Sequence, residues 1–121
     1  MTQRDTVNDE TLLRQMVKII VREVSPEAII LFGSRARGDS RPDSDVDLLI
    51  VESESFSPQR SRRKEAARLY IALKESNVSK DILLYSREEF DHWKNSTNHV
   101  IGRAVREGKV LYSQFSSGMF D

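Results

Sequence analysis

Four residues in the first half of the chain have the types and the spacing for phosphate and metal chemistry. Gly33 and Ser34 end one short apolar run, and after an intervening loop Asp45 and Asp47 open a second one. Side chains two positions apart on a strand share a face, so the two carboxylates would lie roughly 6–7 Å apart at the backbone. Carboxylates this close repel each other unless a cation lies between them, and such ligands suit Mg²⁺ with bound phosphate. The pair therefore predicts a divalent-metal site.

The turn that precedes the pair predicts a phosphate cradle. Gly33 would let the backbone approach a ligand closely, and residues 34–38 would form a helical turn with amides directed at an anion. Arg35 and Arg37 are candidates to bind phosphate oxygens, the alternative being ordinary solvated arginines. The glycine spacing is that of a P-loop, but Asp39 follows where that motif needs the lysine, which excludes it.

The elements expected to position these residues alternate between helix and strand. The loop between the first two strands is too short for a helical crossover, so we expect a small mixed sheet and an α+β fold. Phe90 and Trp93 are expected to pack inward. The expected helices span about 8–24, 59–75 and 98–107, a further helix is expected to start at residues 86–89 with Ser86 as its cap and Glu89 three residues on, and the expected strands span 28–32, 46–51, 81–85 and 110–112.

Composition limits the classes of protein that this chain can belong to. At 121 residues and 38% hydrophobic content, we expect a single domain over 1–121 with a core at about 10–112 and a flexible tail at 113–121. Nineteen basic and nineteen acidic residues give a formal net charge of zero, so no global field attracts nucleic acid. Without cysteine, a secretory signal or a membrane-length apolar segment, we expect a cytoplasmic protein.

Two further groups of polar residues deserve an interpretation. His92 and His99 have no zinc-binding pattern around them and are expected to be surface or packing residues. A basic cluster at Arg60, Arg62, Arg63 and Lys64 falls near the start of an expected helix, where cations are unfavourable. That cluster is either a solvated first turn, an RNA contact or a docking face for an acidic partner.

The full string from Gly33 to Leu49 resembles the signature of the polymerase-beta-like nucleotidyltransferase superfamily. The sequence has Gly-Ser, ten residues, then Asp-Val-Asp. More specifically, it is similar to minimal nucleotidyltransferase, or MNT, domains. The leading helix, Asp81 before a third apolar run, and residues 101–112 also suit that family, so the resemblance covers about residues 10–112. It implies the polymerase-beta-like nucleotidyltransferase fold, a small mixed sheet packed against helices.

The resemblance also implies a role for each site residue. Asp45, Asp47 and Asp81 would bind two Mg²⁺ ions and carry catalysis, with Asp81 helping to deprotonate the attacking hydroxyl. The alternative for Asp81 is a turn residue at the start of a strand. Gly33 and Ser34 would hold the β- and γ-phosphates of ATP, the substrate.

MNT proteins of this kind are typically paired with an all-helical HEPN protein that is an RNase toxin. The resemblance therefore implies an antitoxin that transfers AMP from ATP to a tyrosine hydroxyl of its HEPN partner. One alternative is a non-catalytic module that neutralises its partner by binding, and another is nucleotidyl transfer to a small molecule such as an aminoglycoside. We expect no membrane partner and no direct sequence-specific binding of nucleic acid.

Overall fold

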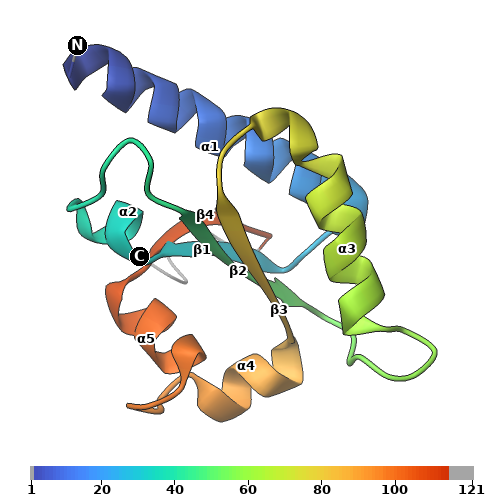
Figure 1. Cartoon of the computed structure of the whole chain (residues 1–121). Helices are drawn as coiled ribbons and strands as arrows, with labels where there is room; N and C mark the ends of the chain where they lie inside the picture. The colour runs from blue at the N-terminus through green and yellow to red at the C-terminus, as the bar shows by residue number, and fades with distance from the viewer. Residues whose placement is uncertain (1, 115–121) are drawn as a thin grey trace.

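The computed structural model describes residues 2–114, with side-chain positions from residue 10 onward (Figure 1). The expected order of helices and strands is confirmed, and the expected tail falls largely outside the described residues, although Ser113 still belongs to a strand. The elements are α1 (Thr2–Val24), β1 (Ala28–Phe32), α2 (Ser34–Arg37), β2 (Val46–Glu52), α3 (Arg62–Ala72), the 3-10 turn η1 (Lys74–Ser76), β3 (Lys80–Ser86), α4 (Arg87–Trp93), α5 (Val100–Glu107) and β4 (Lys109–Ser113).

The four strands form one mixed sheet in the order β3-β2-β1-β4. Strand β1 pairs antiparallel with both β2 and β4, whereas β2 and β3 run parallel and are connected through α3. This arrangement confirms the mixed sheet expected from the short loop between the first two strands. In the register, Asp47 lies opposite Phe32 on one side and Asp81 on the other.

Apolar side chains fill both faces of the sheet. On one face, Met16 and Ile20 of α1 and Leu69 of α3 pack against Leu48 and Ile50 of β2. On the other face, Phe90 of α4 and the buried residues of α5 pack against the alternate residues of β1 and β2. In Figure 1 the long blue α1 and the yellow-green α3 lie together, away from α4 and α5. Because strand side chains alternate, Asp47 falls on the face that carries α4 and α5.

Local sequence signals explain where several helices begin. The Oγ of Ser86 accepts a hydrogen bond from the backbone N–H of Glu89, and the Glu89 carboxylate accepts one from the backbone N–H of Ser86, which confirms the expected capping box. Ser61 caps α3, so this helix begins at Arg62 and not near residue 59. His99 caps α5, because its Nδ1 accepts a hydrogen bond from the backbone N–H of Ile101. This contact agrees with the expectation that His99 is a surface or packing residue.

Two expectations about the helices are wrong. Helix α1 begins at Thr2, two turns before the expected cap near residue 8, so helix propensity extends the element beyond its apolar stripe. Trp93 is 39% exposed at the end of α4, whereas Phe90 packs inward as expected. Ile71 is 67% exposed because α3 is covered on one narrow side only, through Leu69. Within the described residues, no helix is long and apolar enough to cross a membrane.

Candidate functional site

The three aspartates singled out in the sequence all lie at one end of the sheet. Asp45 immediately precedes β2, Asp47 is the second residue of that strand, and Asp81 is the second residue of the parallel strand β3. Asp47 and Asp81 are register partners, so their side chains emerge from the same face on neighbouring strands roughly 4.8 Å apart. Asp47 is half-buried, whereas Asp45 and Asp81 are exposed.

Gly33 brings the turn after β1 directly against Asp47. Its φ of 77° lies in the region that L side chains rarely adopt, and a Cβ added there would lie 2.2 Å from Oδ2 of Asp47. Contacts this short do not occur for real Cβ atoms, so only glycine permits both the turn and the carboxylate beside it. Ser34 follows in the same turn and is half-buried as the first residue of α2.

Arg35 is held by the loop that leads into Asp45. Its Nη2 donates hydrogen bonds to the carbonyl oxygens of Ser44 (2.7 Å) and Pro42 (3.3 Å), and its Nε donates to Ser44 O at 3.1 Å. A planar guanidinium with several donors can bridge two carbonyls in this way, which a lysine cannot do equally well. Arg35 thus ties α2 to the residue that precedes the aspartate pair, a contact with no signal in the sequence.

Arg37 is exposed and lies close to two carboxylates. Its Nε is 3.4 Å from Oδ2 of Asp39, and its Nη1 is 3.9 Å from Oε1 of Glu107. Exposed ion pairs of this length contribute little stability and exchange readily with water or with another anion. Of the two arginines, Arg37 therefore has the side chain that is freer to meet a phosphate.

The negative charges at this end of the sheet are only partly compensated. Burial raises the pKa of Asp47, and the neighbouring carboxylates of Asp81 and Asp45 raise it further, whereas Arg37 and Arg35 act in the opposite direction. Among residues 10–114, no hydrogen bond or ion pair to the side-chain carboxylate of any of the three aspartates is found. A cation bound among them would remove the repulsion that the folded chain leaves in place.

The three aspartates are not preassembled as a metal site. Within the part of the chain that the structure describes, no group of three or more histidine, cysteine, aspartate or glutamate side chains is arranged to hold a metal ion. The donor set nevertheless fits a hard divalent cation, because Asp45 and Asp47 offer carboxylate oxygens beside a turn that only glycine can form. A metal here would be completed by oxygens that the chain does not supply, such as those of a triphosphate.

A second acidic group lies at the opposite end of β2, which extends one residue beyond the expected strand 46–51. Glu52 is the last residue of the strand and is 3% exposed, and its Oε1 accepts a 2.6 Å hydrogen bond from Nη2 of Arg60. Oε2 of Glu52 and Oε2 of Glu65 are both buried and accept no hydrogen bond from the described residues. Burial, and next the neighbouring Glu65, raise the pKa of Glu52 to about 8, which favours the protonated form of this carboxyl.

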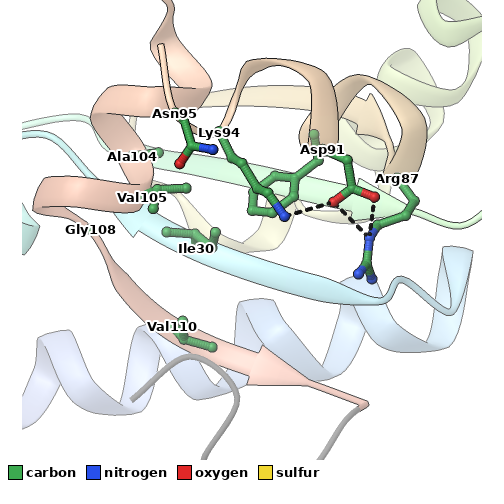
Figure 2. A pocket seen from close by; sticks show the side chains of 10 residues that line it. Ile30, Arg87, Asp91, Lys94, Asn95, Ala104, Val105, Gly108 and Val110 are labelled. Carbon is green, nitrogen blue, oxygen red and sulfur yellow. Dashed lines mark hydrogen bonds and ion pairs between the residues drawn. The ribbon is translucent and has the colours of Figure 1, made fainter. Parts of the chain in front are cut away.

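A hollow on the face of the sheet that carries α4 and α5 is separate from the aspartates. Figure 2 shows this space of about 300 Å³ between α4, α5 and strands β1 and β4. Asp91 lies there between Arg87, at 3.1 Å, and Lys94, at 3.3 Å. None of the residues that we predicted as site residues lines this hollow, and its charges are already paired within the chain.

Comparisons with known proteins agree with this geometry. Residues 14–116 match the family Polymerase beta, Nucleotidyltransferase. Among curated proteins, none matches the chain in sequence. A putative nucleotidyltransferase from Sulfolobus solfataricus superimposes with a TM-score of 0.58 at 18% identity, over 92% of this chain and 86% of that one.

Two further structures with the same fold are toxin–antitoxin proteins. One is a toxin–antitoxin structure with AMP-PNP, with a TM-score of 0.55 at 22% identity over 83% of this chain and 72% of that one. The other is a mutant of the toxin–antitoxin MntA-HpeT, with a TM-score of 0.55 at 18% identity over the same shares of the two chains. At these identities the likeness establishes the fold, and the match over residues 14–116 shows that the chain belongs to the polymerase beta nucleotidyltransferase family.

Proposed function

We propose that this chain is an antitoxin that transfers AMP from ATP to a tyrosine hydroxyl of a HEPN-family RNase toxin. The observation that carries the proposal is the contact between Gly33 and Asp47, because nothing in folding requires a carboxylate against a turn that only glycine can make. Family membership supports nucleotidyl transfer, and the likeness to toxin–antitoxin structures, one of them with AMP-PNP, supports the nucleotide and the partner. ATP as substrate places the reaction in the cytoplasm.

Each site residue has a role in this proposal. Asp45 and Asp47 would hold Mg²⁺, with Asp81 joining them for a second ion through a change of its exposed side chain. When bound, Mg²⁺ supplies positive charge to the oxygens of the triphosphate and the leaving pyrophosphate. Gly33 and Ser34 would bind the β- and γ-phosphates, and Arg37 would add a cation to them.

The proposed reaction forms one bond and breaks another. The phenolic oxygen of the acceptor tyrosine attacks the α-phosphorus of ATP, the bond from that phosphorus to the bridging oxygen breaks, and pyrophosphate leaves. Asp81 would take the phenolic proton, since its side chain is exposed and it lies beside Asp47 on the neighbouring strand. Arg35 would keep the loop before Asp45 in place, through its bonds to Ser44 and Pro42.

The test is transfer of label from ATP to a purified HEPN toxin in the presence of Mg²⁺. We expect label on a tyrosine of the toxin, loss of its RNase activity, and no label with the variant Asp45→Asn/Asp47→Asn. If the wild-type chain forms an intact complex with the toxin but transfers no label to it, the proposed enzymatic activity is overturned. If the double variant silences the toxin as well as the wild type does, the chain acts by binding alone. Label on an aminoglycoside instead of the toxin would favour a small-molecule acceptor.

A further inference from the structure

A groove along the outer edge of strand β3 leads away from the proposed active site. This hollow of about 320 Å³ has the strand residues 82–85 on one side and Arg62, Arg63 and Ala66 of α3 on the other. It begins at the residue that follows Asp81 and ends at Tyr85. Asp81 and Tyr85 emerge from the same face of the strand, with roughly 13 Å of backbone between them. Asp81 itself does not line the groove, but it directly precedes the strand residues that do, so a molecule in the groove has one end at the edge of the sheet near the proposed base.

The backbone at this edge is partly occupied by side chains of the chain itself. The N–H of Ile82 donates a 2.8 Å hydrogen bond to the hydroxyl of Tyr70, and Nη1 of Arg62 donates a 3.2 Å hydrogen bond to the carbonyl of Leu84. These two contacts occupy a backbone N–H and a backbone carbonyl oxygen that a further strand would need for continuous pairing. A partner in this groove would bind through side chains rather than by extending the sheet.

The charge along the groove favours an acidic partner. Arg62 is neutralised by Glu89, whose Oε2 lies 2.7 Å from Nη2. Arg63 and Lys64 are exposed, and no ion pair to either is found in the described part of the chain. They are the second and third residues of α3, where the helix dipole opposes a positive charge. A carboxylate of a partner beside Arg63 and Lys64 would offset the unfavourable interaction of these two charges with the helix dipole.

Tyr85, at the far end of the groove, connects its lining to residues that often anchor protein interfaces. The guanidinium of Arg62 lies 5.5 Å from the centre of the Tyr85 ring, and the ring of His99, outside the groove lining, packs against Tyr85 at 5.7 Å. Trp93 stacks on His99 at 4.4 Å and is 39% exposed. Tryptophan, tyrosine and arginine are enriched among the residues that carry most of the energy of protein interfaces.

We propose that this groove is where the acceptor protein docks, through an acidic segment that binds Arg63 and Lys64 while its hydroxyl reaches Asp81. The inference rests on the proposed function, and it adds the surface that selects the acceptor. A protein segment fits the groove better than RNA, because most of the described residues that line it are apolar or aromatic and its lining holds two cations, Arg62 and Arg63. RNA binding instead requires a stripe of cations that pair with successive phosphates.

Charge reversal separates this docking from catalysis. Arg63→Glu/Lys64→Glu places acidic residues in the first turn of α3, which favours the helix, so unfolding cannot explain a loss of binding. The matched control is Lys18→Glu/Lys74→Glu, which changes the net charge equally at exposed positions away from the groove. Both variants of the full chain are titrated with the HEPN toxin by calorimetry without ATP. Binding of ATP with Mg²⁺ is measured separately.

We expect the groove variant to bind the toxin at least about tenfold more weakly, with ATP binding unchanged and the control like wild type. Equal loss in the control, no loss in the groove variant, or no binding of the toxin by wild type overturns the docking surface. If the groove variant no longer binds a single-stranded RNA probe but still binds the toxin, the groove is an RNA site and the proposed docking surface is overturned. Selective loss of toxin binding by a chain that transfers no label would retain the docking surface and reject only the enzyme.

Discussion

The two ends of strand β2 both collect acidic side chains, and they handle the negative charge in opposite ways. At the far end, Glu52 is buried against Arg60, and burial beside Glu65 raises its pKa to about 8, so it tends to keep its proton. At the near end, Asp47 lies between Asp45 and Asp81 without an ion pair in the described residues, and its pKa is raised by burial and by both neighbours. The chain thus compensates its own charge at one end and leaves it uncompensated at the other.

The difference separates a structural use of acidic residues from a functional one. A compensated group contributes to the folded state without help, whereas uncompensated repulsion persists only where a ligand restores the balance. Substitutions at the near end should therefore reduce transfer at little cost in stability. Substitutions at the far end should change stability and its dependence on pH, with transfer unaffected.

The largest effect is expected at the near end. Asp47→Asn should lower the rate of AMP transfer by at least about a hundredfold, the scale on which a lost electrostatic contact to reacting groups is felt. Its free energy of unfolding should stay equal or rise, because the substitution removes a repelled, half-buried charge. Rates are measured with labelled ATP and stability by urea unfolding.

The matched control for that variant is Asp43→Asn, in the exposed loop before the pair. It should leave both the rate and the stability unchanged. A strongly destabilised Asp47→Asn with proportionate loss of rate would mean that the carboxylate supports the fold, and the contrast between the two ends would disappear.

The close approach of the glycine turn gives the next largest effect. Gly33→Ala adds a Cβ that would overlap Oδ2 of Asp47, and it also strains a backbone with φ of 77°. Gly38→Ala also strains the backbone, with φ of 86° and ψ of 10° in the left-handed helical region, but meets no atom within 4 Å. It should lose about 1–2 kcal/mol of stability from this backbone. Gly33→Ala should lose more, because φ of 77° with ψ of −159° is a conformation that essentially only glycine adopts.

Only the first of these variants should also reduce transfer, by about tenfold or more. The comparison of the two separates the contact with Asp47 from the strain of a positive φ that both share. Equal rates for Gly33→Ala and Gly38→Ala, measured at saturating ATP, would show that the contact has no part in the reaction.

A smaller effect is expected at Arg35, where it tests positioning against direct binding of phosphate. Arg35→Lys keeps the charge but loses the bridge to Ser44 and Pro42, and Arg35→Met loses both. If the bridge positions the loop, both variants should lower kcat by a few-fold, with KM for ATP nearly constant. A normal kcat in Arg35→Lys, together with a raised KM in Arg35→Met, would instead assign the side chain to the phosphates.

The sequence was sufficient to predict the sheet because the signals for it are local. The apolar runs, the short loop after Gly33 and the capping box at Ser86 each act within a few residues, and each is found in the structure. The three aspartates were predicted to share one end of the sheet, and the register of β2 and β3 places Asp47 beside Asp81. Whether they carry the chemistry stays a prediction.

Contacts between distant segments could not be predicted in the same way. The bond from Arg35 to Ser44, and the burial of Glu52 with Arg60 and Glu65, depend on how loops fold back onto the sheet. Trp93 was expected to be inside because aromatic residues usually are, but the end of α4 lies beyond the sheet that covers Phe90. The periodicity of apolar residues shows which face of a helix is apolar, but it does not show how far the neighbouring sheet extends along that helix.

The last prediction concerns the far end, where transfer should not change at all. Because the pKa of Glu52 is raised from about 4.5 to about 8, the folded chain binds a proton that the unfolded chain has released between these values. Stability should therefore be greatest below about pH 4.5 as far as this group is concerned, and fall as the pH rises through 8. Other carboxylates titrate below pH 5, so the window from pH 6 to 9 is the informative one.

In that window, Glu52→Gln should flatten the dependence of unfolding free energy on pH. The amide keeps a donor for Glu65 and an acceptor for Arg60, but it has no proton to lose, so the variant should exceed wild type by roughly 1–3 kcal/mol at pH 9. Urea unfolding at each pH gives the two curves, and AMP transfer at pH 7 should be equal for both proteins. Parallel curves would mean that Glu52 is ionised throughout this window in its ion pair with Arg60, and that its burial beside Glu65 does not keep a proton on it.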